Sequence, residues 1–272
     1  MPNLRIVAVN AADTAIVAEA SAVLPVTNLQ NTTRTSVWRA GGTAATITAS
    51  WVDPVAVDSV ALMTSNLSSA ATWRVRAFDA ADVMIYDSGN VLACPPRPLG
   101  ELDWGFRPLG VNAFAFGLAA QSVLWLPERM LAASVVVDVD DAANPAGYVE
   151  ASRLVIGERW EPVTNMSWGA QLTFEEHGSQ SRADDGTLRS EPGAVSRALE
   201  FGLDWLTETD RAAFAEMSRY LGVHRDFLIS AYPASSADRD AHYTLLAKLT
   251  RAPGIKSVRH AINAAQVACA ET

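Results

Sequence analysis

In the first half of the chain, apolar and polar side chains alternate at every second residue within short runs. Trp73, Val75 and Ala77 form the clearest series, with Arg74 and Arg76 between them. Successive side chains of a β-strand point to opposite faces, so this period places the apolar residues in a core and the arginines in solvent. The pattern predicts a mainly β fold. Further short apolar runs lie at 45–52, 55–63 and 134–139.

Residues that favour turns separate these runs, at 53–54, 66–69, 87–90 and 144–147. Asn, Asp, Gly and Pro adopt or stabilise the backbone conformations that turns require. Short strands separated in this way, with no long helical pattern between them, predict a jelly-roll β-sandwich. Residues 94–100 contain three prolines, which lack amide donors, so an exposed loop is expected there.

The length of the chain, 272 residues, suits two domains better than one. The strand-rich pattern ends near Gly157, and a different series follows. We therefore predict an N-terminal β-sandwich at 1–158 and a second, mixed β/α domain at 159–272. Both are expected to fold, because 49% of the residues are apolar and 19% are charged.

The second domain contains the clearest helix signal in the sequence. The hydroxyl of Thr207 can accept a hydrogen bond from a free amide of a first helical turn. Phe214, Met217 and Leu221 follow at i, i+3 and i+7, which gives one apolar face. The pattern predicts one clear helix at about 207–221. Strands are expected near 172–176, 196–203, 226–231 and 243–250, and a mobile polar loop at 177–193.

Several strings in the first domain occur in an order that resembles galactose-binding-like, discoidin-type modules. Residues 144–157 are similar to the closing strand pair of this module in tail proteins of tailed bacteriophages, and 160–169 to the junction that follows it. The chain thus resembles a minor tail or baseplate protein of the distal-tail type. The strings that carry the likeness to the module are 24–29, 37–39, 58–62 and 66–77.

The resemblance implies a structural component of a phage tail tip or baseplate. Such a protein would assemble with itself, as a homo-oligomeric ring, and with other tail or baseplate proteins. Its location would be the virion tail, after assembly in the host cytoplasm. The alternative is a carbohydrate-binding or host-adhesion module of the tail that contacts a glycan of the host surface. Sugar-binding discoidin modules have a cluster of exposed aromatics and carboxylates on one loop. No such cluster is evident in this sequence.

Four residues are candidates for contact with a partner or a glycan. In the resembled fold, Arg34, Trp38 and Arg39 lie in loops at one end of the sandwich, where they either bind a partner or cap the sandwich. Trp104 lies beside the proline-rich loop and either contacts a protein or glycan or packs beneath its own loop.

No sequence pattern supplies a catalytic, cofactor or metal site. The four histidines show neither i, i+4 nor short metal-ligand spacing, and no Gly-x-Ser-x-Gly elbow occurs. We therefore predict a protein that is not an enzyme and that needs no cofactor. The acidic residues 138–141 either form a solvated turn or hold a hard cation such as calcium.

Charge and hydropathy limit the class of partner. The net charge of −9 argues against nucleic acid, which needs a basic surface, although a local basic patch is compatible with it. The N-terminus lacks a basic segment followed by a long apolar one, so no signal peptide is expected, and no uncharged apolar segment reaches about 18 residues, so no membrane insertion is expected. Cys94 and Cys269 lie far apart in the sequence, and no disulfide is expected.

Overall fold

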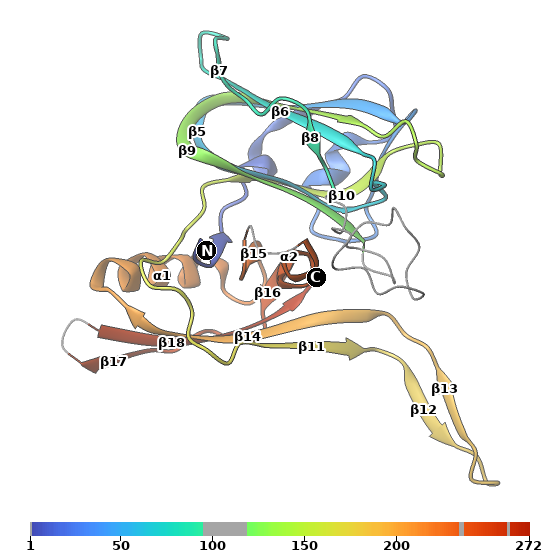
Figure 1. Cartoon of the computed structure of the whole chain (residues 1–272), viewed down its shortest axis with the longest axis vertical. Helices are drawn as coiled ribbons and strands as arrows, with labels where there is room; N and C mark the ends of the chain where they lie inside the picture. Colours follow the sequence, from blue (N-terminus) through green and yellow to red (C-terminus); the bar gives the residue numbers. More distant parts are fainter. Residues whose placement is uncertain (1, 95–118, 234–236, 260–261) are drawn as a thin grey trace. The chain divides into compact units, whose positions relative to one another are not determined.

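The computed structural model describes residues 2–94, 119–233, 237–259 and 262–272 (Figure 1). The chain divides into two compact units. The sandwich unit comprises Val7–Trp160 and Ala234–His242, and the mixed unit comprises Met1–Ile6, Glu161–Pro233 and Tyr243–Thr272. The predicted division at 158/159 differs from these units mainly in two places, since it placed the first six residues in the sandwich domain and 234–242 in the second domain. The expected loop at 94–100 lies, after Cys94, outside the described residues.

The sandwich unit is mainly β, as predicted. Its sheet follows the order β3-β4-β10-β5-β9-β6-β7, with β2 paired to β5 and β8 paired to β6. The unit also contains two 3-10 helices and most of helix α2 (Ala237–Tyr243). Its strands are β2 (Ile16–Ala18), β3 (Ala22–Leu24), β4 (Trp38–Ala40), β5 (Ala44–Ser65), β6 (Thr72–Phe78), β7 (Met84–Asp87), β8 (Val91–Leu92), β9 (Ala120–Asp140) and β10 (Glu150–Gly157).

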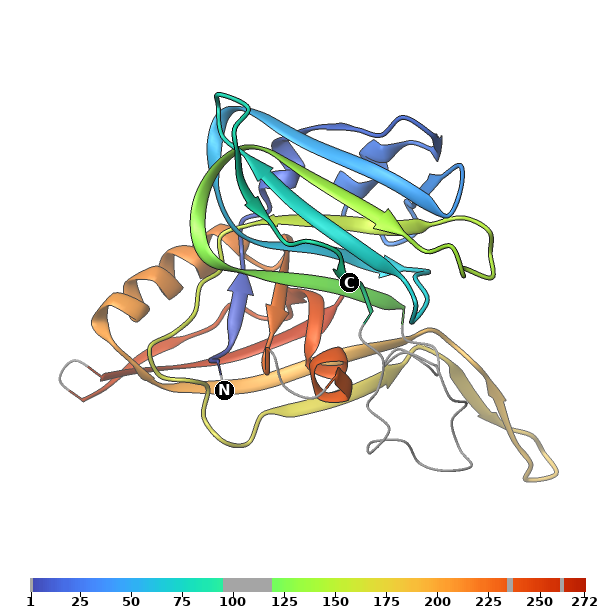
Figure 2. The same ribbon diagram turned by 45° about the horizontal axis from the view of Figure 1, so that its top comes forward.

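Strands β5 and β9 are long, and they pair with each other in antiparallel fashion along most of their length. Both curve strongly, as Figure 2 shows. Their first paired half, from Ala44 to Ser50 of β5, is flanked by β2 and β6, and the other half is flanked by β10. One bent strand pair therefore contributes to both layers of the sandwich.

The chain stays extended at 53–54, where the sequence predicted a turn between two strands. The ladder between β5 and β9 is irregular between Ser50 and Val55. Pro54 has no amide hydrogen, and a position where the ladder is interrupted accommodates it without loss of a hydrogen bond. The proline thus lies within one continuous strand, at an interruption of its ladder.

The alternation in β6 has the predicted orientation. Trp73, Val75 and Ala77 are at most 2% exposed and belong to the core, whereas Arg74 and Arg76 face outward. The paired strands supply the same kind of inner face, with buried alanine, isoleucine and valine side chains at Ala45, Ile47, Ala49, Val135, Val137 and Val139.

The mixed unit contains a sheet of order β1-β15-β16-β18-β14-β11, with β17 paired to β18. Helix α1 (Glu208–Leu221) confirms the predicted helix. The strands of the mixed unit are β1 (Arg5–Val7), β11 (Gln171–Glu176), β12 (Ser179–Arg182), β13 (Leu188–Glu191), β14 (Val195–Leu206), β15 (Asp226–Ser230), β16 (Thr244–Leu249), β17 (Ile255–Arg259) and β18 (Ile262–Glu271).

The expectation of a loop at 177–193 is wrong, because this segment forms a β-hairpin. Strands β12 and β13 pair in antiparallel register, and Gly186 adopts a left-handed φ of 85° in the turn. Every residue of both strands is exposed. Hydrophobic periodicity detects a strand only when one face is buried, so a hairpin that is solvated on both faces leaves no such signal.

No helix among the described residues combines the length and the apolar character that crossing a bilayer requires.

The cap of α1 can be tested by substitution. The Thr207 hydroxyl accepts a hydrogen bond from the Asp210 amide at 3.1 Å and donates one to its carboxylate at 2.8 Å. We expect Thr207→Ala to lower the free energy of unfolding of the mixed unit by roughly 1 kcal/mol in urea titrations. Thr207→Ser, which keeps the hydroxyl, should retain most of the stability, and equal losses in both variants would contradict the capping role.

Candidate functional site

The strongest candidate site lies on the outward face of β5, β9 and β6, where polar side chains form rows across the strands. Thr46 and Arg74 both stand opposite Asp138, and Thr72 stands opposite Asp140. Directly opposed residues of an antiparallel pair share a face, so these five side chains lie on one surface. The rows belong to the face that the core does not use.

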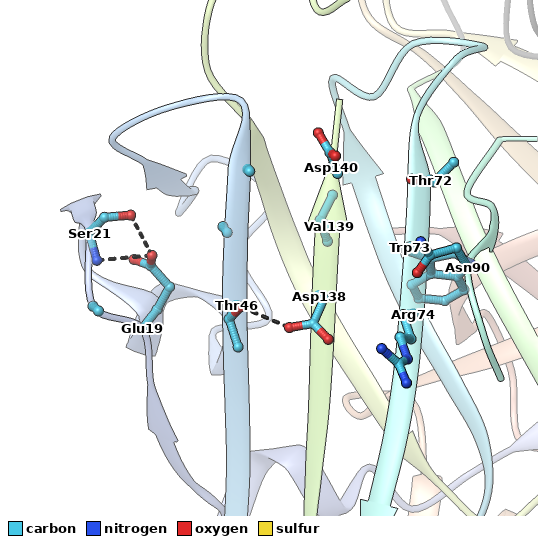
Figure 3. Close-up of a pocket in the computed structure, with 13 residues that line it drawn as sticks. Glu19, Ser21, Thr46, Thr72, Trp73, Arg74, Asn90, Asp138, Val139 and Asp140 are labelled. Carbon is cyan, nitrogen blue, oxygen red and sulfur yellow. Dashed lines mark hydrogen bonds between the residues drawn. The ribbon is translucent and has the colours of Figure 1, made fainter. Parts of the chain in front are cut away.

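These rows form the floor of a hollow with a volume of about 530 Å³, here called the groove (Figure 3). Its wall comes from the turn between β2 and β3, and Asn90 closes it from the segment before β8. Trp73 contributes to the lining but is only 2% exposed, so it offers no open ring face. The lining residues are Glu19, Ala20, Ser21, Ala44, Ala45, Thr46, Thr72, Trp73, Arg74, Asn90, Asp138, Val139 and Asp140.

Close approach of two backbone segments positions the wall of the groove. The Gly41 amide donates a hydrogen bond of 2.8 Å to the Ser21 carbonyl. A Cβ atom at position 41 would lie 2.8 Å from that oxygen, so only glycine permits this approach. Within the turn, Oε1 of Glu19 accepts hydrogen bonds from the Ser21 amide at 3.0 Å and from its hydroxyl at 2.7 Å.

Ion pairs hold the floor of the groove in place. Arg74 donates to both carboxylate oxygens of Asp87 at 2.8 and 2.5 Å, and this pairing holds the pKa of Asp87 well below its usual range. Asp138 accepts from Arg76 at 2.7 Å and from the Thr46 hydroxyl at 2.8 Å. Both arginines of β6 are therefore oriented by bonds to fixed carboxylates.

Other polar groups of the groove make no hydrogen bond to any residue that the structure describes. They are the Asp140 carboxylate, the Thr72 hydroxyl, the Asn90 amide and the Nη1 group of Arg74. Oε2 of Glu19 also has no partner there, but it is buried. The set contains both donors and acceptors. A ligand hydroxyl, which donates one hydrogen bond and accepts others, matches such a mixture.

Of the four residues predicted from the sequence, the three that the structure describes, Arg34, Trp38 and Arg39, do not line this groove. Trp38 is 0% exposed and lies in strand β4 within the sandwich core, not in a loop at one end of the sandwich. Arg39 pairs with Glu150 at 2.8 Å and lies 4.1 Å above the Tyr148 ring, and Arg34 is exposed. Trp104 lies outside the described residues, and the binding roles of Arg34, Arg39 and Trp104 stay predictions.

Sequence reasoning missed the groove, although a signal for it was present. Thr46, Arg74 and Asp138 all occupy outward positions of strands with a period of two. Such residues are ordinarily solvated, and only strand register reveals which of them become neighbours. Glu19 and Asn90 come from turns that carry no distinguishing pattern.

The segment 138–141 is not a solvated turn throughout. Strand β9 continues to Asp140, which is exposed, whereas Asp141 is 1% exposed. The Asp141 carboxylate accepts hydrogen bonds from the Ser68 amide at 2.8 Å, the Ser68 hydroxyl at 2.5 Å and the Asn144 amide at 2.9 Å. These bonds join two loops of the sandwich. No cluster of three His, Cys, Asp or Glu side chains suited to a metal ion occurs within the described ranges.

Cys94, Cys269 and Asp58 have pKa values that burial raises, and all three lie outside the groove. Burial raises the pKa of the Cys94 and Cys269 thiols to about 12, so both stay protonated and unreactive at neutral pH. Burial also raises the pKa of Asp58, whose carboxylate accepts a hydrogen bond of 2.8 Å from the Arg159 amide. Neither thiol lines the groove, and Asp58 lies outside its lining as well.

No protein-family model matches the chain, and no curated protein matches it. Solved structures with similarity include the lectin domain of lectinolysin complexed with Lewis B antigen, which is 12% identical with a TM-score of 0.37. That match covers 54% of this chain and 95% of the domain. A Streptococcus pneumoniae fucose binding module, SpX-3, is 8% identical with a TM-score of 0.37, and the match covers 55% of this chain and 98% of the module. At these values, the similarity does not bear on what this chain binds.

The role of Asp141 can be separated from that of its neighbour. We expect Asp141→Ala to lower the free energy of unfolding of the sandwich unit by roughly 1–3 kcal/mol, because the Ser68 amide loses its acceptor. Asp140→Ala, at an exposed position, should change it by less than about 0.5 kcal/mol. Urea titrations of the two variants measure the difference, and comparable stabilities would show that the buried bonds contribute nothing.

Proposed function

We propose that the sandwich unit is a carbohydrate-binding module that holds an uncharged saccharide in the groove. The observation that carries the proposal is the hollow of about 530 Å³, in which the polar side chains of Thr72, Asn90 and Asp140 have no partners among the described residues. Volumes of roughly 300–1,000 Å³ are typical of sites for small molecules. The groove therefore has room for one or two sugar rings.

The charges of the groove favour an uncharged saccharide over an acidic one. Glu19, Asp138 and Asp140 contribute three carboxylates, of which Asp138 is paired with Arg76, and Arg74 is paired with Asp87. Carboxylate oxygens accept hydrogen bonds from sugar hydroxyls, and hydrogen bonds to charged groups contribute roughly 1.5–3 kcal/mol each. An anionic sugar would meet a repulsive field at the same place.

The rigidity of the floor supports binding with little reorganisation. Thr72 and Asp140 lie opposite each other on paired strands. The Arg74 side chain is held by its ion pair with Asp87 of β7. Groups that are held in place before the ligand arrives lose less conformational entropy on binding. The groove has no open aromatic face, so the expected affinity is modest, with a dissociation constant on the order of 1 mM to 10 µM.

The experiment is a screen of the full chain against a glycan array, followed by calorimetric titration of the best uncharged ligand. Asp140→Ala and Asn90→Ala should each weaken binding about tenfold, which corresponds to about 1.4 kcal/mol. Asp53→Ala, an exposed carboxylate of the same unit outside the groove, should leave the affinity unchanged. Absence of binding at millimolar saccharide, or equal affinity in Asp140→Ala and Asp53→Ala, would rule the site out.

A second candidate function is structural: assembly of the chain with itself and with other proteins of a phage tail tip or baseplate, within the virion. The observation that favours assembly is the exposed hairpin β12–β13 of the mixed unit, together with the edge strand β11. Phe174, Leu188 and Val195 are each more than half exposed in this region. An exposed strand edge with apolar side chains is a surface on which another chain can pair.

Removal of the hairpin tests this second candidate. If it mediates assembly, the full chain should form a defined oligomer by mass measurement and negative-stain imaging, and a variant lacking residues 179–191 should be monomeric. A full chain that stays monomeric at high concentration and does not associate with tail proteins would exclude the structural function.

A further inference from the structure

The mixed unit contains a second hollow, of about 450 Å³, on the outward face of β14, β18 and β17. It is here called the basic hollow. Asp204 of β14, Lys256 of β17 and Gln266 of β18 supply polar side chains, and Arg251 comes from the loop before β17. The other lining residues are small: Ala252, Gly254, Ala264 and Ala265.

Strand register places these side chains on one surface. Lys256 stands opposite Ala264, and Gln266 stands opposite Gly202. Ala265 and its second neighbour Val267 are each 2% exposed, so Ala264 and Gln266 point to the other, outward face. A Cβ atom at position 202 would lie 2.9 Å from Nε2 of Gln266. Glycine at this position thus allows the Gln266 amide to lie across β14, beside Asp204.

The cations of the basic hollow have no counter-ion within hydrogen-bonding distance among the described residues. Arg251 and Lys256 are exposed, and neither forms an ion pair or a side-chain hydrogen bond there. Some other arginines of the same unit are paired, whereas Arg189, like the cations of the hollow, forms no ion pair with a described residue. Arg197 donates to both carboxylate oxygens of Glu271 at 2.9 and 2.7 Å, and Arg5 pairs with Glu161 at 2.9 Å.

The sequence around the hollow is basic in a chain that is acidic overall. Residues 248–259 contain two lysines and two arginines and no carboxylate, although the net charge of the chain is −9. Both lysines of the whole sequence lie in this segment. The local field of the hollow therefore attracts anions, whereas the groove of the sandwich unit repels them.

We propose that the basic hollow binds an acidic saccharide, one that carries a carboxylate or a phosphate group. The oxyanion sits between Arg251 and Lys256, because a guanidinium fork and an ammonium both complement such a group. Asp204 accepts hydrogen bonds from ring hydroxyls, and the Gln266 amide can donate to or accept from them. The alanine and glycine residues of the lining are small, so they leave space for a sugar ring in the hollow. This site is independent of the groove.

Titration of the full chain with glucuronic acid and with glucose 6-phosphate tests the proposal. Saturable binding is expected for at least one of them, weakened about tenfold by Lys256→Gln and by Arg251→Gln, and weakened further as salt screens the exposed charges. Both residues are exposed, so the variants should fold. Arg189→Gln, which removes an exposed cation of β13, should leave the affinity unchanged.

Two further comparisons identify the ligand class and the location. Neutral glucose should bind at least tenfold more weakly than the acidic sugars at this site, and so should inorganic phosphate, which has no ring hydroxyls for Asp204 and Gln266. Equal affinity for inorganic phosphate, or equal affinity of Lys256→Gln and Arg189→Gln, would overturn the proposal. Binding that is lost in Asp140→Ala and retained in Lys256→Gln would assign the ligand to the groove, which also overturns it.

Discussion

The antiparallel pairing of β5 with β9 is the constraint on which the sandwich unit depends. Each strand exceeds 20 residues, and the pair bends so that its two halves serve both layers. The other described strands of the sheet extend from this pair on one side or the other, directly or through one or two intervening strands. Pro54 fits within β5 because the ladder is irregular between Ser50 and Val55, so the proline costs no paired amide.

The same pairing generates the groove. Because side chains alternate along paired strands, a buried row such as Val75 and Val137 requires an outward row beside it, and Arg74 and Asp138 belong to that row. The core thus orders the polar face without using it. The turn between β2 and β3 forms one wall of the groove. The close contact of Gly41 with the Ser21 carbonyl holds this turn in position.

The two proposed sites share this architecture and differ in charge. In each, outward side chains of adjacent strands surround a hollow whose floor is backed by core residues. Carboxylates dominate the groove, whereas Arg251 and Lys256 dominate the basic hollow. Such a difference follows from the identity of a few exposed residues, which the fold tolerates freely because they bury little surface. Ligand class is therefore a property of the rim and not of the β architecture.

Several features could be predicted from the sequence because their physical cause is local. Alternation determined which face of β6 is buried, and the Thr207 cap with its apolar positions determined α1, since both depend on neighbours within a few residues. The burial of Trp38 and of Asp141 was decided only by tertiary structure, as was the neighbourhood of Asp140, Thr72 and Asn90. These depend on register and on loops that meet across long sequence separations, which local patterns do not record. The alternation of β6 and the position of helix α1 were thus predictable from the sequence, whereas the hairpin β12–β13 and the sites follow from the way the strands pair.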